Sequence, residues 1–249
     1  LRLIARRTLR FFEEFVNEYE HALPPDNFQE DPKPAEAHRT SPTNMGLYLL
    51  STTAAHDFGW IGILDMVDRL EATLETMTAM PRYRGHFLNW YDTQNLRPLE
   101  PRYVSTVDSG NLAGHLIALA QACRDFRHRP LFGPERVEGI KDALQLVLGS
   151  VEEAGYLRRT QRTAAARLRE AAEAMTARLE DPPTSLPGWV REFERLETGA
   201  QDLLDIAHTL SRGDEAAPLS EVRVWTSAVR DSILSHARDL GTTAPEAAT

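Results

Sequence analysis

Apolar residues recur at steps of three and four positions through most of the sequence, which is the spacing of one face of an α-helix. The pattern is clearest in the second half, where one series runs from Trp189 to Leu210 and another from Val222 to Leu240. The run VSTV at 104–107 is the only β-like stretch, and it is too short to found a sheet. The sequence therefore predicts an all-α protein.

Proline and glycine mark where several of these helices end. The pair Pro24-Pro25 follows the first helix, and Gly59 follows the second. Residues 1–240 are expected to belong to one domain, and the Thr-, Ala- and Pro-rich tail 241–249 to be disordered. We expect about eight helices, at 3–16, 42–57, 62–79, 109–126, 137–151, 156–180, 189–210 and 222–240.

The composition excludes several classes of function. The net charge is −9, with 28 basic and 37 acidic residues, which argues against a nucleic-acid partner because phosphates require a basic face. No apolar run approaches the roughly 20 residues that cross a bilayer, so no membrane span is expected within this segment. The single cysteine, Cys123, excludes an internal disulfide. Because the sequence starts within an amphipathic helix and without Met, we expect a segment of a longer protein.

Two of the expected helices share a weak internal repeat. In each copy a polar loop leads into a helix of small residues, and an amphipathic helix follows. Repeating helix pairs of this kind are typical of an α/α toroid, in which the loops of one face converge on the centre. The sequence therefore favours an incomplete toroid, with Gly46 and Gly114 permitting close helix packing. The matched residues are Ser41, Gly46, Ala54, Asp57 and Phe58, which recur 68 positions later as Ser109, Gly114, Ala122, Asp125 and Phe126.

The stretch that leads into the fourth expected helix carries the clearest binding signature. Connections in helical proteins usually run about 2–8 residues, whereas RGHFLNWYDTQNLRPLEPRYVSTVDSGNLAGHL fills 84–116. Aromatic faces alternate there with amides and carboxylates. This arrangement suits a sugar ring, which has an apolar CH face and a rim of hydroxyls. We therefore expect a carbohydrate-binding surface in this stretch.

Several polar residues near the starts of helices have two interpretations. Ser41 or Thr43, and Asp108 or Ser109, are suited to cap the helices that follow. They are equally suited to meet a ligand at the partially positive end of a helix. Arg39 suits either a surface ion pair or contact with a sugar hydroxyl or a carboxylate.

The aromatic pair Trp90 and Tyr91 suits either the core or a ligand, and its position between Asn89 and Asp92 favours the ligand. Asp92 and Asp108 are the only appealing pair for glycoside chemistry, which uses two carboxyl groups about 5–10 Å apart. The histidines lack HxxxH or HExxH spacing and no cysteine cluster exists, so no metal site is expected. GxSxG, GxGxxG and Walker motifs are also missing, so Ser-nucleophile chemistry and nucleotide binding have no support.

Three long runs resemble the cyclic β-1,2-glucan synthases of Gram-negative bacteria, which are large, membrane-embedded, multidomain enzymes. The runs are PPDNFQEDP (24–32), HRTSPTNMGLYLLSTTAAHDFGW (38–60) and RGHFLNWYDTQNLRPLEPRYVSTVDSGNLAGHLIALAQAC (84–123), and the resemblance is looser over 130–249. It implies the first part of a glucoamylase-like α/α-toroid domain that is associated with transglycosylation and ring closure. It also implies the cytoplasmic face of the inner membrane as the location, with β-1,2-glucan and the neighbouring domains as partners.

The same resemblance implies which residues face a glucan. The family's acid/base and nucleophilic glutamates lie in later sequence, so the catalytic residues of this chain stay unknown, with Asp92 and Asp108 as candidates. UDP-glucose is the donor of a neighbouring glycosyltransferase domain, and no cofactor is expected in this segment. The alternative function is a non-catalytic helical scaffold that joins the neighbouring domains. The positions that match the family's site-facing motifs are Arg39, Thr40, Ser41, Asn44, Asn89, Trp90, Tyr91, Asp92, Asp108, Ser109 and Asn111.

Overall fold

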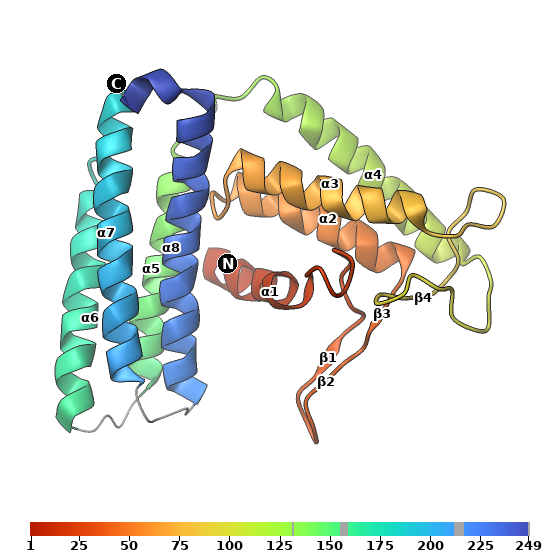
Figure 1. The fold of residues 1–249 in the computed structure, drawn as a ribbon, viewed down its shortest axis with the longest axis horizontal. Coiled ribbons are helices and arrows are strands. Elements are labelled where there is room, and N and C mark those ends of the chain that lie inside the picture. The colour runs from red at the N-terminus through yellow and green to blue at the C-terminus, as the bar shows by residue number, and fades with distance from the viewer. Residues whose placement is uncertain (131, 155–158, 212–216, 249) are drawn as a thin grey trace. The chain divides into compact units, whose positions relative to one another are not determined.

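The computed structural model describes residues 1–130, 132–154, 159–211 and 217–248, and these residues confirm the all-α prediction. The contacts divide the chain into two compact units. The first unit comprises Leu1–Arg6, Asp57–Leu64 and Phe132–Thr249, and the second comprises Arg7–His56 and Asp65–Leu131. The α-helices (Figure 1) are α1 (Arg2–Phe15), α2 (Pro42–Asp57), α3 (Ile63–Ala79), α4 (Thr106–Phe126), α5 (Glu135–Glu153), α6 (Arg159–Arg178), α7 (Leu186–Leu210) and α8 (Ala217–Thr243).

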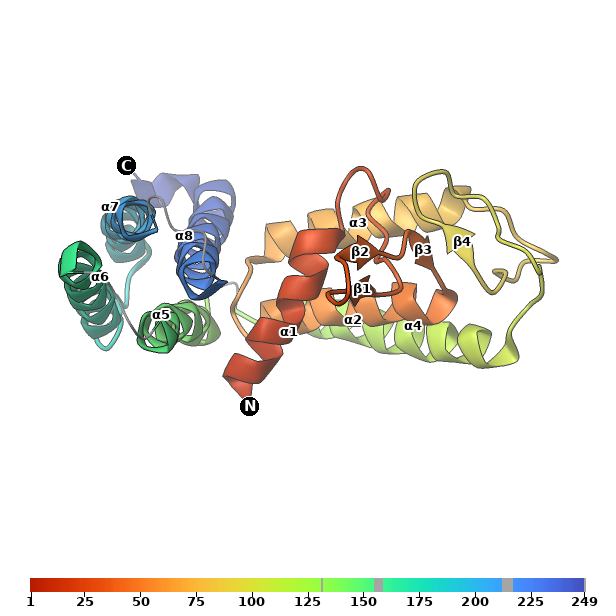
Figure 2. The ribbon, with the colours of Figure 1, turned by 90° about the horizontal axis from the view of Figure 1, so that it is seen from below.

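The first unit is built on a bundle of α5, α6, α7 and α8, which Figure 2 shows nearly end-on. The apolar series predicted on α5, α7 and α8 all face one core, in which Ile140, Leu196 and Val229 are fully buried. Helix α6 completes this core with residues such as Leu168. Each such side chain contributes about 1.5–3 kcal/mol when it leaves water, so the three- and four-residue spacing determines how the bundle closes.

The segment 57–64 packs on this bundle by close backbone contact and by capping. Gly59 has a positive φ of 75°, and a Cβ atom on Gly139 would lie 1.9 Å from the Gly59 carbonyl oxygen. The Asp239 carboxylate accepts hydrogen bonds from the backbone N–H groups of Ile63 (2.7 Å) and Leu64 (3.0 Å). Asp239 therefore caps the start of α3, and Gly59 ends the α2 segment as the sequence predicted.

The second unit contains most of α1, nearly all of α2, most of α3 and all of α4, with α2 beside α3 in both ribbon views (Figures 1 and 2). Helix α4 packs on α2 at Gly46, where an added Cβ would lie 2.3 Å from His115 Nδ1. The prediction that Gly46 permits close packing is thus confirmed. It is wrong for Gly114, because no described atom lies within 4 Å of its Cβ position.

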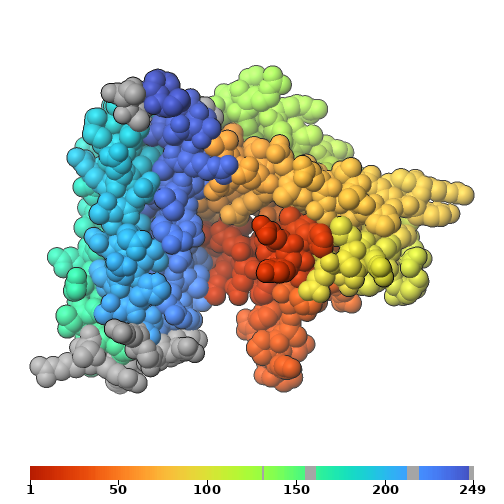
Figure 3. Space-filling view, viewed as in Figure 1, coloured from red at the N-terminus to blue at the C-terminus, as the bar shows by residue number. Residues whose placement is uncertain are grey.

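Four two-residue strands, absent from the predicted elements, form two antiparallel pairs in the second unit. Strand β1 (Phe28–Gln29) pairs with β2 (Ala35–Glu36), and β3 (Arg39–Thr40) pairs with β4 (Tyr91–Asp92). The β1–β2 hairpin projects from the helices of its unit (Figures 1 and 3). Strands this short cannot show the apolar alternation by which strands are identified in a sequence, so only tertiary pairing reveals them.

Helix boundaries differ from the predictions at α4 and at the C-terminal end. Helix α4 begins at Thr106, and its cap is Ser105, whose Oγ accepts a hydrogen bond from Asp108 N at 3.2 Å. Neither Asp108 nor Ser109 is the cap. Residues 241–248, expected to be disordered, continue α8 to Thr243 and then form a 3-10 helix, Pro245–Ala248. The predicted cap of α2 is confirmed, since Ser41 Oγ accepts from Asn44 N at 3.3 Å.

Candidate functional site

The start of α2 brings together residues that lie far apart in the sequence. Strand β3 directly precedes α2, and it pairs with β4 in the loop that follows α3. In this register Arg39 lies opposite Asp92, and Thr40 lies opposite Tyr91. The pairing places the polar and aromatic loop beside the first turn of α2. All three runs that resemble the glucan synthases meet at this place, because Arg39 also pairs with Asp26 of the run 24–32.

The Arg39 side chain contacts both a carboxylate and an aromatic ring at this place. Its Nη2 and Nε atoms lie 2.8 Å and 3.2 Å from Asp26 Oδ2, and its guanidinium carbon lies 4.7 Å from the centroid of the Trp90 ring. Asn44 Nδ2 donates to the other oxygen of Asp26 at 3.4 Å. The ion-pair interpretation of Arg39 is thus confirmed, while its side chain stays half exposed. Sequence reasoning did not single out Asp26, because no motif spacing links it to Arg39.

A second hydrogen-bond network joins the first turns of α2 and α4. Thr43 Oγ1 donates to Asp108 Oδ1 at 2.5 Å, and Asn111 Nδ2 donates to Thr43 Oγ1 at 3.1 Å. Thr43 and Asn44 are neighbours in the chain, so this network adjoins the one around Asp26. The structure therefore gathers Arg39, Asn44, Trp90, Asp108 and Asn111 around two helix starts. We call these five residues the α2-start surface.

Four of the predicted binding residues lie inside the protein. Tyr91 is fully buried, and its hydroxyl donates to the Pro81 carbonyl oxygen and accepts from Leu88 N, both at 2.7 Å. Burial raises the pKa of this phenol. Thr40, Ser41 and Asn89 are buried as well. These four side chains are not exposed in this structure, and their contact with a glucan stays a prediction.

The two carboxylates considered as a catalytic pair both accept hydrogen bonds within the protein. Asp92 Oδ1 accepts from the backbone N–H groups of Gln94 (2.9 Å) and Asn95 (3.1 Å), which is a turn typical of aspartate. Asp108 is bonded to Thr43, as described above. Their pairing as acid and base stays a prediction.

Ser109 lines a pocket of 240 Å³ near the α2-start surface. Its Oγ atom is buried and has no hydrogen-bond partner among the described residues. The lining also includes Phe87, whose ring centroid lies 4.4 Å from the Arg82 guanidinium carbon. The pocket is smaller than the roughly 300–1,000 Å³ of sites that enclose a drug-sized ligand. It suits one part of a longer ligand, and Ser109 supplies a free hydrogen-bonding group.

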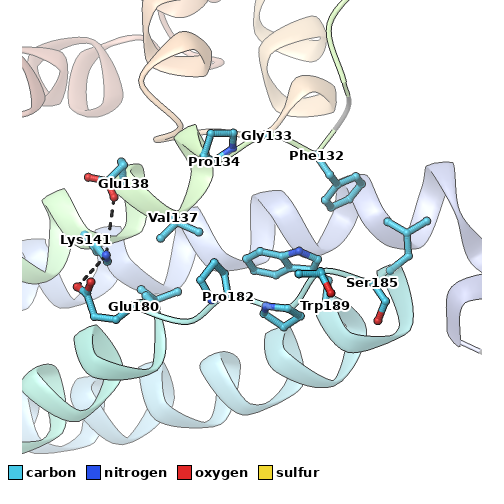
Figure 4. A pocket seen from close by; sticks show the side chains of 14 residues that line it. Phe132, Gly133, Pro134, Val137, Glu138, Lys141, Glu180, Pro182, Ser185 and Trp189 are labelled. Carbon is cyan, nitrogen blue, oxygen red and sulfur yellow. Dashed lines mark ion pairs between the residues drawn. The ribbon is translucent and has the colours of Figure 1, made fainter.

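The first unit has its own pocket, of 760 Å³, between α5 and the connection from α6 to α7 (Figure 4). Trp189 and Pro182 form part of its apolar wall. At one rim, Lys141 Nζ lies 2.8 Å from Glu180 Oε1 and 3.7 Å from Glu138 Oε1. The sequence identified Trp189 only as a core residue, and its ring does belong to the core cluster. No sequence signal pointed to this pocket, since it depends on how a loop packs on a helix.

One group of side chains in the second unit has the composition of metal ligands. A carboxylate oxygen of Glu20, one of Glu36 and a ring nitrogen of His38 all lie within 4.8 Å of one another. The expectation of no metal site rested on motif spacing, and these three residues follow no such motif. Only folding brings Glu20 to the β2–β3 connection.

Comparison with known proteins shows which protein the sequence is similar to. The sequence matches no protein-family model. It is 41% identical over 247 residues to the cyclic beta-(1,2)-glucan synthase NdvB of Rhizobium meliloti (strain 1021). The chain is homologous to a segment of that synthase. The alignment covers 96% of this chain and 8% of NdvB.

The similarity to NdvB confirms the resemblance seen in the three sequence runs. It also extends over 130–249, where those runs gave only a loose likeness. Among the described residues, no helix combines the length and the apolar character that crossing a membrane requires.

Proposed function

We propose that this chain belongs to the transglycosylation and ring-closure region of a cyclic β-1,2-glucan synthase, and that it binds the glucan at the α2-start surface. The observation that carries the proposal is the position of Trp90. Trp90 is partly exposed, and the half-exposed guanidinium of Arg39 lies over its ring, 4.7 Å from the centroid. Arg39 shares the Asp26 carboxylate with the amide of Asn44. An aromatic ring together with planar polar groups suits the apolar face and hydroxyl rim of a glucose unit.

In this proposal the residues of the surface have separate roles. Trp90 stacks on one glucose ring, and Arg39 and Asn111 donate hydrogen bonds to hydroxyl groups. Asp26 and Thr43 orient those donors through the bonds described above. The pocket at Ser109 receives a neighbouring unit of the chain. Sequence outside this chain supplies the catalytic carboxylates and the remaining helices of an α/α toroid.

The proposal retains the expected setting at the cytoplasmic face of the bacterial inner membrane, with the adjoining synthase domains as partners. Homology to NdvB supports the enzyme, and the sequence motifs support the region within it. UDP-glucose belongs to a neighbouring glycosyltransferase domain in this arrangement, so this segment needs no cofactor for its proposed role.

Calorimetric titration of the chain with linear β-1,2-glucan tests the proposal. Trp90→Ala is expected to weaken binding about 3- to 10-fold, because a stacked aromatic contributes about 0.5–1.5 kcal/mol beyond the area it buries. Trp189→Phe is the matched control, since it changes a tryptophan of the first unit and keeps an aromatic ring. Unchanged affinity in a folded Trp90→Ala variant, or an equal loss in the control, would contradict the assignment.

The alternative is a non-catalytic scaffold, and one observation favours it. Arg39, Asp92 and Asp108 all have protein partners, as expected of groups that serve only to fix loops. Asp108→Asn in the full-length synthase separates the two functions. Lost cyclisation with normal chain elongation supports the binding surface, whereas normal cyclisation by a stable variant supports the scaffold.

A further inference from the structure

Two carboxylates and an imidazole converge beside β3 in the second unit. His38 Nδ1 lies 3.0 Å from Glu20 Oε1 and 3.8 Å from Glu36 Oε1. Glu20 comes from the turn after α1, Glu36 ends β2, and His38 lies just before β3. Three segments of a loop-rich region therefore meet at these three side chains.

Among the described residues that contact the two glutamates, His38 is the only group that can carry a positive charge, and it does so only when protonated. Glu20 is only 2% exposed, and its other partners, Thr93 Oγ1 and Gln94 Nε2, are neutral donors. Glu36 Oε1 is buried and has no hydrogen-bond partner among the described residues. Burial raises the pKa of Glu36, the charge of Glu20 raises it further, and His38 acts in the opposite direction. Buried charges in proteins are generally paired or bound to a metal ion.

The tautomer of His38 decides whether its Nδ1 lone pair is available to a metal ion. Nδ1 lies 3.0 Å from Glu20 Oε1 and 3.3 Å from Gln94 Nε2. Gln94 Nε2 also lies 3.1 Å from Glu20 Oε1, so it has an acceptor without His38. With the ring proton on Nε2, the Nδ1 lone pair is free to bind a cation.

We propose that Glu20, Glu36 and His38 bind a divalent transition-metal ion, for which Zn²⁺ is the best fit. Zinc bonds of about 2.0–2.2 Å to nitrogen and oxygen place tetrahedral ligand atoms about 3.3 Å apart. The distances of 3.0 Å and 3.8 Å from Nδ1 to the two carboxylates lie on either side of that value. The side chain of His38 is 44% exposed, so water reaches the fourth position.

The ion would link separate segments of the chain. It joins the turn at Glu20 to the β2–β3 connection. The hydrogen bond from Thr93 to Glu20 then connects these segments to the residue after β4. Arg39 of the α2-start surface follows His38 directly in the chain. The metal site therefore fixes the β3–β4 pair, although the ligand assignment itself does not depend on glucan binding.

The test is a calorimetric titration of the chelator-treated chain with ZnCl₂. We expect one Zn²⁺ per chain and a rise in the melting temperature when it binds. Glu36→Gln and His38→Gln should each weaken Zn²⁺ binding by at least about 10-fold, since even residues behind the ligands change metal affinity 10- to 100-fold. Glu71→Gln, which removes an exposed carboxylate of α3, is the control and should bind Zn²⁺ like the wild type.

Two results would overturn the site. One is a wild-type chain that takes up no stoichiometric Zn²⁺. The other is uptake with equal affinity in both ligand variants and the control, which would assign the ion to other surface groups such as Cys123. If a ligand variant does not fold, the ring resonances of His38 in the wild-type chain decide. A shift on Zn²⁺ addition supports the site, and unchanged resonances refute it.

Discussion

The two compact units of this chain are stabilised in different ways. The first unit buries continuous apolar faces, and its buried carboxylate Asp142 is fully engaged by the Arg2 guanidinium at 2.6 Å and the Trp60 indole N–H at 2.7 Å. The second unit holds long loops in place with polar side chains. Buried polar atoms without a hydrogen-bond partner among the described residues occur at Glu36, Thr40, Ser109 and His115 in the second unit, and at Ser232 in the first.

The positions of two of these unpartnered atoms indicate where recognition takes place. A buried polar atom without a partner costs about 1–3 kcal/mol, and native proteins keep few of them. Two of these atoms, at Glu36 and Ser109, belong to the proposed metal site and to the pocket beside the α2-start surface. We therefore expect the bundle to supply stability and the second unit to supply binding.

The largest effect is expected from truncating the core of the bundle. Trp225 is almost fully buried in α8, so Trp225→Ala should lower the free energy of unfolding by about 3–5 kcal/mol. Leu234→Ala is the control, because Leu234 is exposed on the same helix, and such changes usually stay within about 0.5 kcal/mol. Urea unfolding followed by circular dichroism measures both. A loss below 1 kcal/mol for Trp225→Ala would contradict a bundle closed by its apolar faces.

A smaller effect is expected at the contact between α2 and α4. Gly46→Ala places a methyl group against the His115 ring and should cost about 1–3 kcal/mol, as overpacking usually does. Gly114→Ala meets open space and should stabilise the helix by about 0.5–1 kcal/mol, because alanine loses less backbone freedom than glycine. Unfolding midpoints of the two variants give the comparison. Equal effects would show that α4 does not pack on α2 at Gly46.

Removal of one buried hydroxyl tests how the loop of the second unit is held. Tyr91→Phe deletes the bonds to Pro81 and Leu88 and should cost about 1–3 kcal/mol. Tyr83→Phe, at an exposed tyrosine of the same loop, should change the free energy of unfolding little. Limited proteolysis of the loop measures the local effect. If the loop of the Tyr91→Phe variant resists proteolysis as well as the wild-type loop does, the hydroxyl has no structural role.

The same tyrosine predicts a small pH effect with a defined sign. Burial raises the pKa of Tyr91 in the folded state above its value in the unfolded state, which is about 10. The hydroxyl therefore makes its full contribution to the free energy of unfolding below about pH 10. That contribution is lost as the pH rises through the higher pKa of the folded state. The stability difference between wild type and Tyr91→Phe should therefore shrink above pH 10. A difference that stays constant or grows in alkaline solution would contradict burial of the phenol.

The helices could be predicted because their signal is local. The apolar series of α5, α7 and α8 repeats within each helix, and Ser41 and Gly59 mark helix ends by their own chemistry. The start of α4 was predicted too late because Ser105 lies within VSTV, a run with β propensity. A single capping bond from Asp108 N outweighs that propensity.

The candidate site was only partly predictable because its contacts are tertiary. Asn89 and Trp90 have similar sequence surroundings, yet one side chain is buried and the other is partly exposed. Asp26 lies in the run 24–32 that resembles the glucan synthases, but nothing in that run indicated its bond to Arg39. The Glu20–Glu36–His38 cluster gave no signal, since its members lie at separations that match no motif. The aromatic and polar composition of residues 84–116 identified the loop. Which of its side chains reach the surface depends on the β3–β4 pairing, and the sequence does not show that pairing.

Hydrogen exchange with and without linear β-1,2-glucan compares the two units most directly. Glucan binding at the α2-start surface predicts slower exchange in peptides covering 39–44 and 89–111, with no change across α5 to α8. Protection centred on the pocket at Lys141 and Trp189, or no protection anywhere at saturating glucan, would contradict the assignment of recognition to the second unit.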